Sequence, residues 1–234
     1  MIRAIVCVIF WGCYVVFAGV LGIPTTLITG DVSFLWKLAM WGARAGVKLG
    51  GVKIVAVGRE QLDPKAAYIY MSNHVSNIDP PAEVPELPQR IAVMAKAELF
   101  NIPILGRAMR LAQFVPVDRK NRDAAIDSVR EAVRTVQGGM SMLVYPEGTR
   151  SRDGRLLPFK KGPFHLAKES GVPVVPITFA GSQKVWPKGK FAIYPGVIEM
   201  IFHKPMDPAK YESRESLMVA VRDVIASALP EDQR

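Results

Sequence analysis

The feature that most constrains the fold is an uncharged stretch near the start of the chain. Residues 4–30 read AIVCVIFWGCYVVFAGVLGIPTTLITG and hold no charged side chain. A helix of ~20 residues is about 30 Å long, close to the thickness of the hydrocarbon layer of a bilayer. We interpret the segment as a membrane-spanning or membrane-embedded anchor. A cleaved signal peptide and a buried core helix are the alternatives, although AGVLG is a poor cleavage site.

The next segment favours the anchor. Residues 32–51, VSFLWKLAMWGARAGVKLGG, predict a second helix with one stripe at helical spacing, formed by Lys37, Trp41, Arg44 and Lys48. Long basic side chains beside tryptophans are typical of a helix at the headgroup level of an anionic leaflet. A solvated charged stripe on an ordinary helix is the alternative.

The net charge indicates the kind of partner, and the cysteine positions give no sign of a metal site. The 234-residue chain has a formal net charge of +9 and an isoelectric point near 9.7, which favours an anionic partner. Cys7 and Cys13 both lie in the apolar run, at no metal-binding spacing. The aromatic residues are not interleaved with the basic runs, so nothing indicates nucleic-acid binding.

After Gly51 the pattern becomes that of an α/β fold. Short β-branched runs alternate with helical patterns over 122–139, 162–171 and 213–229. We expect a mixed, mostly parallel sheet of about seven strands flanked by helices. The predicted strands are 52–57, 67–72, 91–95, 113–117, 141–145, 172–179 and 197–202. The chain divides into a membrane-associated helical segment, 1–51, and an α/β domain, 52–234.

The stretch SNHVSNIDPP, 72–81, is the first candidate site. His74 follows a predicted strand, and Asp79 comes five residues later, before Pro80. Asp-Pro also suits a helix N-terminus, which is the structural explanation for Asp79. A loop-to-helix turn would bring the two side chains within hydrogen-bond reach. Asp79 would then fix the imidazole tautomer and leave the other nitrogen as a base for a hydroxyl.

Basic clusters follow other predicted strands or open a predicted helix. YPEGTRSRDG, 145–154, contains Arg150, which could hold a phosphate bidentately. In PFKKGPF, 158–164, Lys160 and Lys161 precede a predicted helix whose free N–H groups favour anions. FVPVDRKNR, 114–122, and MAKAEL, 94–99, are the other clusters. These four clusters either converge on one bound anion or are scattered surface charge.

Several mechanisms have no signature. The chain has no GxSxG elbow, no Walker A loop and no GxGxxG turn. It has no zinc-ligand spacing, so we expect no metal.

These blocks together resemble the glycerolipid acyltransferases, in particular the bacterial 1-acylglycerol-3-phosphate acyltransferases. NHVSNIDP matches the NHxxxxD block, and FVPVDR, PEGTRS and VPVVPITFAGS resemble the second, third and fourth blocks in order. The resemblance implies an α/β enzyme that transfers a fatty acyl group from a thioester to the sn-2 hydroxyl of 1-acylglycerol 3-phosphate, giving phosphatidic acid. Acyl-CoA or acyl carrier protein would be the co-substrate, without a bound cofactor.

The resemblance also implies roles for single residues. His74 would be the general base and Asp79 would orient it. The glycerol phosphate would be bound by Arg119, Arg150 and Lys96. The acceptor pocket would be shaped by Glu147, Gly148 and Thr149. The sequence departs from the family pattern in two places. PPAEVPELPQR after Asp79 is rich in proline and predicts a short or broken helix. The second block reads FVPVDR, where the family often has a phenylalanine, one isoleucine or valine, and then Asp-Arg; the basic residue is retained.

Two alternatives concern the substrate and the class of protein. The acceptor could be another lyso-phospholipid, a lyso-aminolipid or glycerol 3-phosphate. The second alternative is a non-catalytic protein that binds anionic lipids. His74 and Asp79 argue against it, because a binding protein needs neither residue. A cytosolic donor would place the catalytic domain on the cytoplasmic face of the inner membrane. The sequence indicates no oligomeric state.

Overall fold

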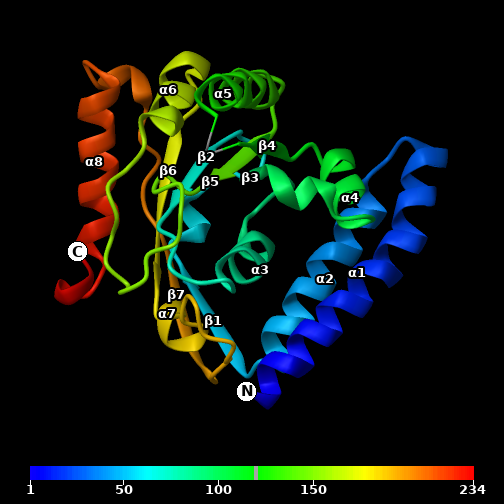
Figure 1. The fold of residues 1–234 in the computed structure, drawn as a ribbon. Helices are drawn as coiled ribbons and strands as arrows, with labels where there is room; N and C mark the ends of the chain where they lie inside the picture. Colours follow the sequence, from blue (N-terminus) through cyan, green and yellow to red (C-terminus); the bar gives the residue numbers. More distant parts are fainter. Residues whose placement is uncertain (119–120) are drawn as a thin grey trace.

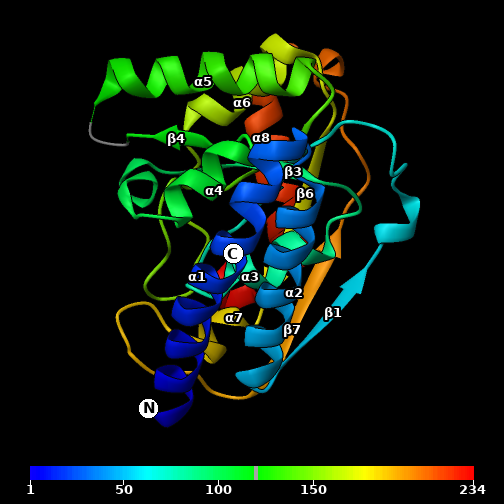
Figure 2. The same ribbon diagram turned by 90° about the vertical axis from the view of Figure 1, so that its right-hand side faces the viewer.

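The computed structural model describes residues 1–118 and 121–234. Within them a seven-stranded sheet lies between two groups of helices (Figures 1 and 2). The strands are β1 (Val52–Val57), β2 (Ile69–Ser72), β3 (Ile91–Lys96), β4 (Val115–Val117), β5 (Ser141–Val144), β6 (Val174–Ala180) and β7 (Gly196–Phe202). The α-helices are α1 (Ile2–Thr29), α2 (Ser33–Leu49), α3 (Asp79–Glu83), α4 (Leu105–Leu111), α5 (Arg122–Gln137), α6 (Lys161–Ser170), α7 (Ser182–Val185) and α8 (Arg214–Ser227). The 3₁₀ helices are η1 (Arg59–Gln61), η2 (Val84–Glu86), η3 (Ala97–Asn101), η4 (Pro208–Lys210) and η5 (Glu231–Gln233).

The sheet confirms the predicted fold class. Its strand order is β1-β7-β6-β2-β5-β3-β4, and of these neighbours only β6 and β7 run antiparallel. Strands β2 to β6 therefore share one direction. Their carboxyl ends meet at one edge of the sheet, which is where ligand sites form in open α/β sheets.

The central strands are buried because helices cover both faces of the sheet. Every residue of β2 and β5 is buried, which explains their continuous apolar runs. On one face α5, α6 and α8 contribute apolar side chains at helical spacing, among them Val133, Leu166 and Val221. On the other face, residues of α1, α2 and α3 join a second core with Tyr70 and Ile177.

Helices α1 and α2 pack side by side as a helical hairpin (Figure 1). Small residues of α2 allow the close approach, because a Cβ atom at Gly42 would lie 2.1 Å from the Tyr14 ring and one at Gly46 would lie 2.2 Å from Trp11. Both aromatic side chains also donate to α2: Trp11 Nε1 to the Gly42 carbonyl at 3.2 Å and Tyr14 Oη to the Leu38 carbonyl at 3.0 Å. The hairpin is thus held by shape and by hydrogen bonds.

Among the described residues, α1 is the one helix long and apolar enough to cross a membrane. The most apolar window of α1 has a mean hydropathy of 2.5, and only 22% of that window is buried. This exposure disfavours the core-helix alternative and favours contact with lipid. The exposed large apolar residues of α1 are Ile2, Ile5, Val6, Val8, Ile9, Val16, Phe17, Val20, Leu21, Leu27 and Ile28, and its N-cap Met1 is also exposed.

Local residues explain the C-terminal end of α6 and the N-terminal end of α8. Gly171 ends α6 in the left-handed conformation at φ 70°, and Ser213 caps α8 in a capping box with Ser216. Helix α6 begins at Lys161, so Pro163 lies in its first turn. The helix after Asp79 is short, as expected: α3 has five residues and passes into η2, which contains Pro85.

The glycine contacts predict a selective effect of alanine on the hairpin. Alanine favours a helix over glycine by about 1 kcal/mol. At the open position Gly12, where a Cβ meets nothing within 4 Å, Gly12→Ala should keep or raise the melting temperature. At Gly46 the added methyl group meets Trp11, so Gly46→Ala should cost about 1–3 kcal/mol. Thermal unfolding of both variants in the same detergent measures the difference, and equal melting temperatures would contradict the packing described.

Candidate active site

The candidate site forms where three parallel strands end. The loop 73–78 follows β2, the loop 145–160 follows β5, and the segment from Gly181 follows β6. The Asn73 side chain joins two of these ends. Its amide nitrogen donates to the Phe179 carbonyl at 2.9 Å, and its amide oxygen accepts from the Phe179 N–H at 2.8 Å. His74 therefore stands on a loop that is anchored to the neighbouring strand.

The predicted contact between His74 and Asp79 is confirmed. His74 Nδ1 donates to Asp79 Oδ2 at 2.8 Å, and the carboxylate is completely buried. The same oxygen accepts the backbone N–H groups of Val75 and Ser76, each at 2.8 Å. The carboxylate turns back to the 74–76 loop, although Asp79 is also the first residue of α3. These three donors compensate a buried charge and fix the imidazole with Nδ1 protonated.

Glu147 holds the His74 loop from the opposite side. Its Oε1 accepts the His74 N–H at 2.7 Å, and its Oε2 accepts the Leu157 N–H at 2.9 Å. Burial raises the pKa of Glu147 to about 7, against the opposing effect of these two hydrogen bonds. A further bond joins the loops, from the Ser151 N–H to the His74 carbonyl at 2.9 Å. Glu147 thus acts on the backbone around His74.

Tyr145 supports the imidazole ring itself. The two rings are stacked, with centroids 4.1 Å apart and planes 20° from parallel. The Tyr145 hydroxyl donates at 2.8 Å to Oε2 of Glu83, a fully buried carboxyl on α3. Burial raises the pKa of Glu83 to about 8. Its Oε1, like Oδ1 of Asp79, has no hydrogen-bond partner by distance and angle in the described part of the chain.

The loop after Glu147 carries positive charge beside the His74 loop. Arg150 Nη1 donates to the Asn77 side-chain oxygen, and Lys188 Nζ donates to the Arg150 carbonyl. Partial burial lowers the pKa of Lys188, and the guanidinium groups of Arg150 and Arg152 lower it further. This crowding of cations produces a positive potential that an anion would relieve.

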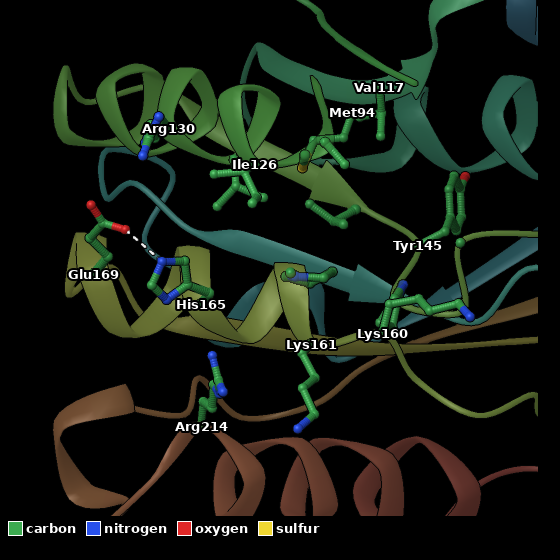
Figure 3. A pocket seen from close by; sticks show the side chains of 17 residues that line it. Met94, Val117, Ile126, Arg130, Tyr145, Lys160, Lys161, His165, Glu169 and Arg214 are labelled. Carbon is green, nitrogen blue, oxygen red and sulfur yellow. Dashed lines mark ion pairs between the residues drawn. The ribbon is translucent and has the colours of Figure 1, made fainter. Parts of the chain in front are cut away.

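A cavity of about 940 Å³ extends from Tyr145 between α5 and α6. Figure 3 shows Tyr145 and Lys160 at one end, with Arg130 and Glu169 toward the other. Its lining is apolar at Met94, Val117, Ala125, Ile126, Val129, Val144, Pro146 and Pro163, and charged or titratable at Arg130, Lys160, Lys161, His165, Glu169 and Arg214. His74 stacks on Tyr145 but is not among the residues that line this cavity. The cavity suits a ligand with a long apolar part and an anionic end.

Some of the other predicted site residues line this cavity and others do not. Gly148, with φ 68°, and the lysines at 160 and 161 line the cavity, and Lys161 also pairs with Glu215 at 3.3 Å. Thr149 is exposed. Lys96 pairs with Glu98 at 2.9 Å and is absent from the cavity lining. Arg119 lies outside the described residues.

Within residues 1–118 and 121–234, no group of three or more His, Cys, Asp or Glu side chains is placed to hold a metal ion. Three residues of the site were missed by sequence reasoning: Asn73, Tyr145 and Glu83. Asn73 and Tyr145 stand inside blocks that the sequence singled out. Glu83 carried a weaker signal, as an acid within an apolar, proline-rich segment.

Known proteins share both the sequence pattern and the fold. The model of the acyltransferase family matches residues 53–180. A 1-acyl-sn-glycerol-3-phosphate acyltransferase of Limnanthes douglasii is 38% identical over 187 residues, covering 79% of this chain and 66% of that protein. The alpha form of that enzyme from Mus musculus is 32% identical over 180 residues, covering 76% of this chain and 63% of the other. The chain thus spans slightly less than two thirds of the length of these relatives.

A solved structure agrees over nearly the whole chain. The 1-acyl-sn-glycerophosphate acyltransferase PlsC of Thermotoga maritima superposes with a TM-score of 0.84 at 28% identity, covering 97% of this chain and 94% of that one. The family match covers more than half of the chain, and its residues include the His74–Asp79 pair and the Glu147 loop. This chain is a member of the acyltransferase family.

Proposed function

We propose that this protein transfers a fatty acyl group from an acyl thioester to the sn-2 hydroxyl of 1-acylglycerol 3-phosphate, giving phosphatidic acid. The observation that carries the proposal is the 2.8 Å contact between His74 Nδ1 and the buried Asp79 carboxylate. No hydrogen bond from the described residues occupies His74 Nε2. The names of the relatives support the choice of acceptor.

In the proposed reaction His74 is the general base. The acceptor hydroxyl gives its proton to Nε2 while its oxygen bonds to the thioester carbonyl carbon. The tetrahedral intermediate collapses as the carbon–sulfur bond breaks, and the thiolate takes the proton from the imidazolium. Asp79 stabilises the imidazolium, and Tyr145 keeps the ring in place through stacking. The donor is acyl-CoA or acyl carrier protein, and no metal or cofactor takes part in the proposed steps.

We propose that Arg150, together with Lys160 and Lys161 of the cavity lining, binds the acceptor phosphate. Arg150 lies on the loop that Glu147 ties to His74, so binding at one part of the loop orients the other. Lys160 and Lys161 line the cavity at the start of α6, where free N–H groups add to the attraction. Arg119 and Lys96 remain proposed phosphate ligands, and Gly148 and Thr149 parts of the acceptor pocket, on the family pattern alone.

The exposed apolar surface of α1 supports a place at the membrane. Both the acceptor and the product carry long acyl chains, so a site close to the bilayer would avoid extracting them into water. We propose the cytoplasmic face of the inner membrane, because the thioester donor is made in the cytosol.

The first test is turnover by the catalytic pair. The purified protein in vesicles receives labelled acyl-CoA and a panel of lyso-lipids and glycerol 3-phosphate. His74→Ala should lower turnover roughly 10²–10⁴-fold because the base is lost, and Asp79→Asn should lower it because Asn cannot stabilise the imidazolium. Membrane association should be unchanged in both. Turnover equal to wild type in His74→Ala would remove His74 from the mechanism.

The second test concerns the phosphate. Arg150→Gln should raise the KM for 1-acylglycerol 3-phosphate at least ~10-fold, since a charge-assisted bond to phosphate contributes about 1.5–3 kcal/mol. Arg155→Gln is the matched control on the same loop, and its KM should match that of wild type. A KM that is unchanged in Arg150→Gln, or equally raised for an acceptor without phosphate, would contradict this role.

The third test uses the buried carboxyl group beneath Tyr145. Glu83 has a pKa of about 8 when folded, against an ordinary value of 4.5. The folded state therefore holds a proton that the unfolded state releases. Its stabilising effect is complete below the unfolded pKa and is lost as the pH rises through about 8. Glu147, also raised, acts in the same direction.

We expect the free energy of unfolding of the wild type to fall between pH 5 and pH 8. In Glu83→Gln, which keeps an acceptor for the Tyr145 hydroxyl, this fall should be smaller. Urea unfolding across that range measures both slopes. If the two slopes coincide, Glu83 is not protonated in the folded protein.

A further inference from the structure

A second cavity, of about 490 Å³, lies between α2 and the segment that joins α3 to β3. It unites two sequence features that the proposed acyl transfer does not use: the basic stripe of α2 and the proline-rich segment. The lining residues from these two parts are Trp36, Lys37, Met40, Trp41, Arg44, Val84, Pro85, Leu87, Pro88, Gln89 and Arg90, and Arg59 of η1 completes it.

The cavity has an excess of positive charge. Four of its lining side chains are cationic: Lys37, Arg44, Arg59 and Arg90. Glu86 pairs with two of them, at 3.7 Å from Arg44 Nε and 4.0 Å from Arg59 Nη1. Asp31 lies within range of the charges of Arg90 and Lys37, which lower its pKa further below the ordinary value after its hydrogen bonds to Ser33. The Glu86 distances are long and the side chains are partly exposed, so the pairs leave most of the positive potential in place. An anion with several oxygens would satisfy these donors better than one carboxylate does.

The walls of the cavity are aromatic and stiff. Trp36 and Trp41 come from α2, and Pro85 and Pro88 fix the backbone of the opposite wall. Arg44 Nη2 donates to the Pro85 carbonyl, which holds that wall against α2. The cavity is therefore built from two elements joined by contacts.

The cavity is continuous with the apolar surface of the hairpin. Trp41 is 59% exposed and its ring lies 5.3 Å from that of Tyr14 on α1. Tyr14 in turn contacts Phe17, which is 54% exposed, at 5.8 Å. A ligand in the cavity would thus have its charged end among arginines and could leave an apolar tail along this aromatic row.

We propose that this cavity binds the phosphate headgroup of an anionic phospholipid of the bilayer. Arginine forks match phosphate oxygens, and tryptophans prefer the membrane interface. The segment that forms one wall follows α3, which begins at Asp79. A bound lipid would link α2 to this segment and so set the orientation of the catalytic loop toward the bilayer. The binding step involves no acyl transfer and can be tested without a donor.

The test uses the full chain reconstituted in phosphatidylcholine vesicles. Phosphatidylglycerol with brominated acyl chains is added in rising proportion, and quenching of tryptophan fluorescence gives the half-saturating mole fraction. Brominated phosphatidylcholine added in the same proportions gives the quenching that bulk lipid causes at the hairpin tryptophans, and phosphatidylglycerol should half-saturate at a clearly lower mole fraction than this background. Arg59→Gln and Arg90→Gln should each raise the half-saturating fraction about five-fold, as expected for one basic side chain at an anionic surface.

Arg134→Gln, on α5 across the sheet, is the matched control with the same charge change and should behave as the wild type does. The proposal is wrong if Arg59→Gln and Arg90→Gln quench as the wild type does, or if Arg134→Gln shifts the fraction equally. Glycerol 3-phosphate outside the vesicles should not relieve the quenching, and relief would assign the site to soluble phosphates. Failure of acyl transfer would leave all of these readings unaffected.

Discussion

One carboxylate oxygen, Oδ2 of Asp79, organises the candidate site. It accepts one imidazole N–H and two backbone N–H groups, each at 2.8 Å. A completely buried charge is costly unless donors surround it, and here the donors are the loop that carries His74. The same oxygen therefore fixes both the conformation of the loop and the orientation of the imidazole. Glu147, which follows β5, and Phe179 of β6 hold this loop through hydrogen bonds to His74 and Asn73.

Parallel strands explain why blocks far apart in the chain act together. The carboxyl ends of β2, β5 and β6 share an edge, which joins the His74 loop, the Glu147 loop and the start of α7. The Ser76 hydroxyl donates to the Trp186 carbonyl at 2.7 Å across this edge. The ring of Tyr145 stacks on the imidazole, and its hydroxyl donates to the buried carboxyl of Glu83.

The sequence predicted those parts that depend on local pattern. All seven strands were located because apolar β-branched runs between helical patterns are distinctive, and the His74–Asp79 contact spans only five residues. The Tyr145–Glu83 bond joins residues 62 apart and the Asn73–Phe179 bonds join residues 106 apart. Spacing in the sequence predicts neither contact, because both depend on the order of the strands in the sheet and on how α3 packs. The same reason hid the second cavity, whose walls come from α2 and residues 84–90.

The pairing of β1 has a consequence for the order of events during synthesis. β1 follows the hairpin directly, yet its ladder partner is β7, with Val52 opposite Gly196. The hairpin and β1 leave the ribosome long before β7 is translated, and until then β1 is an unpaired edge. α1 and α2 can therefore engage lipid while the rest of the chain is still nascent. Closure of the sheet is then among the last steps, and it takes place with the growing protein already tethered.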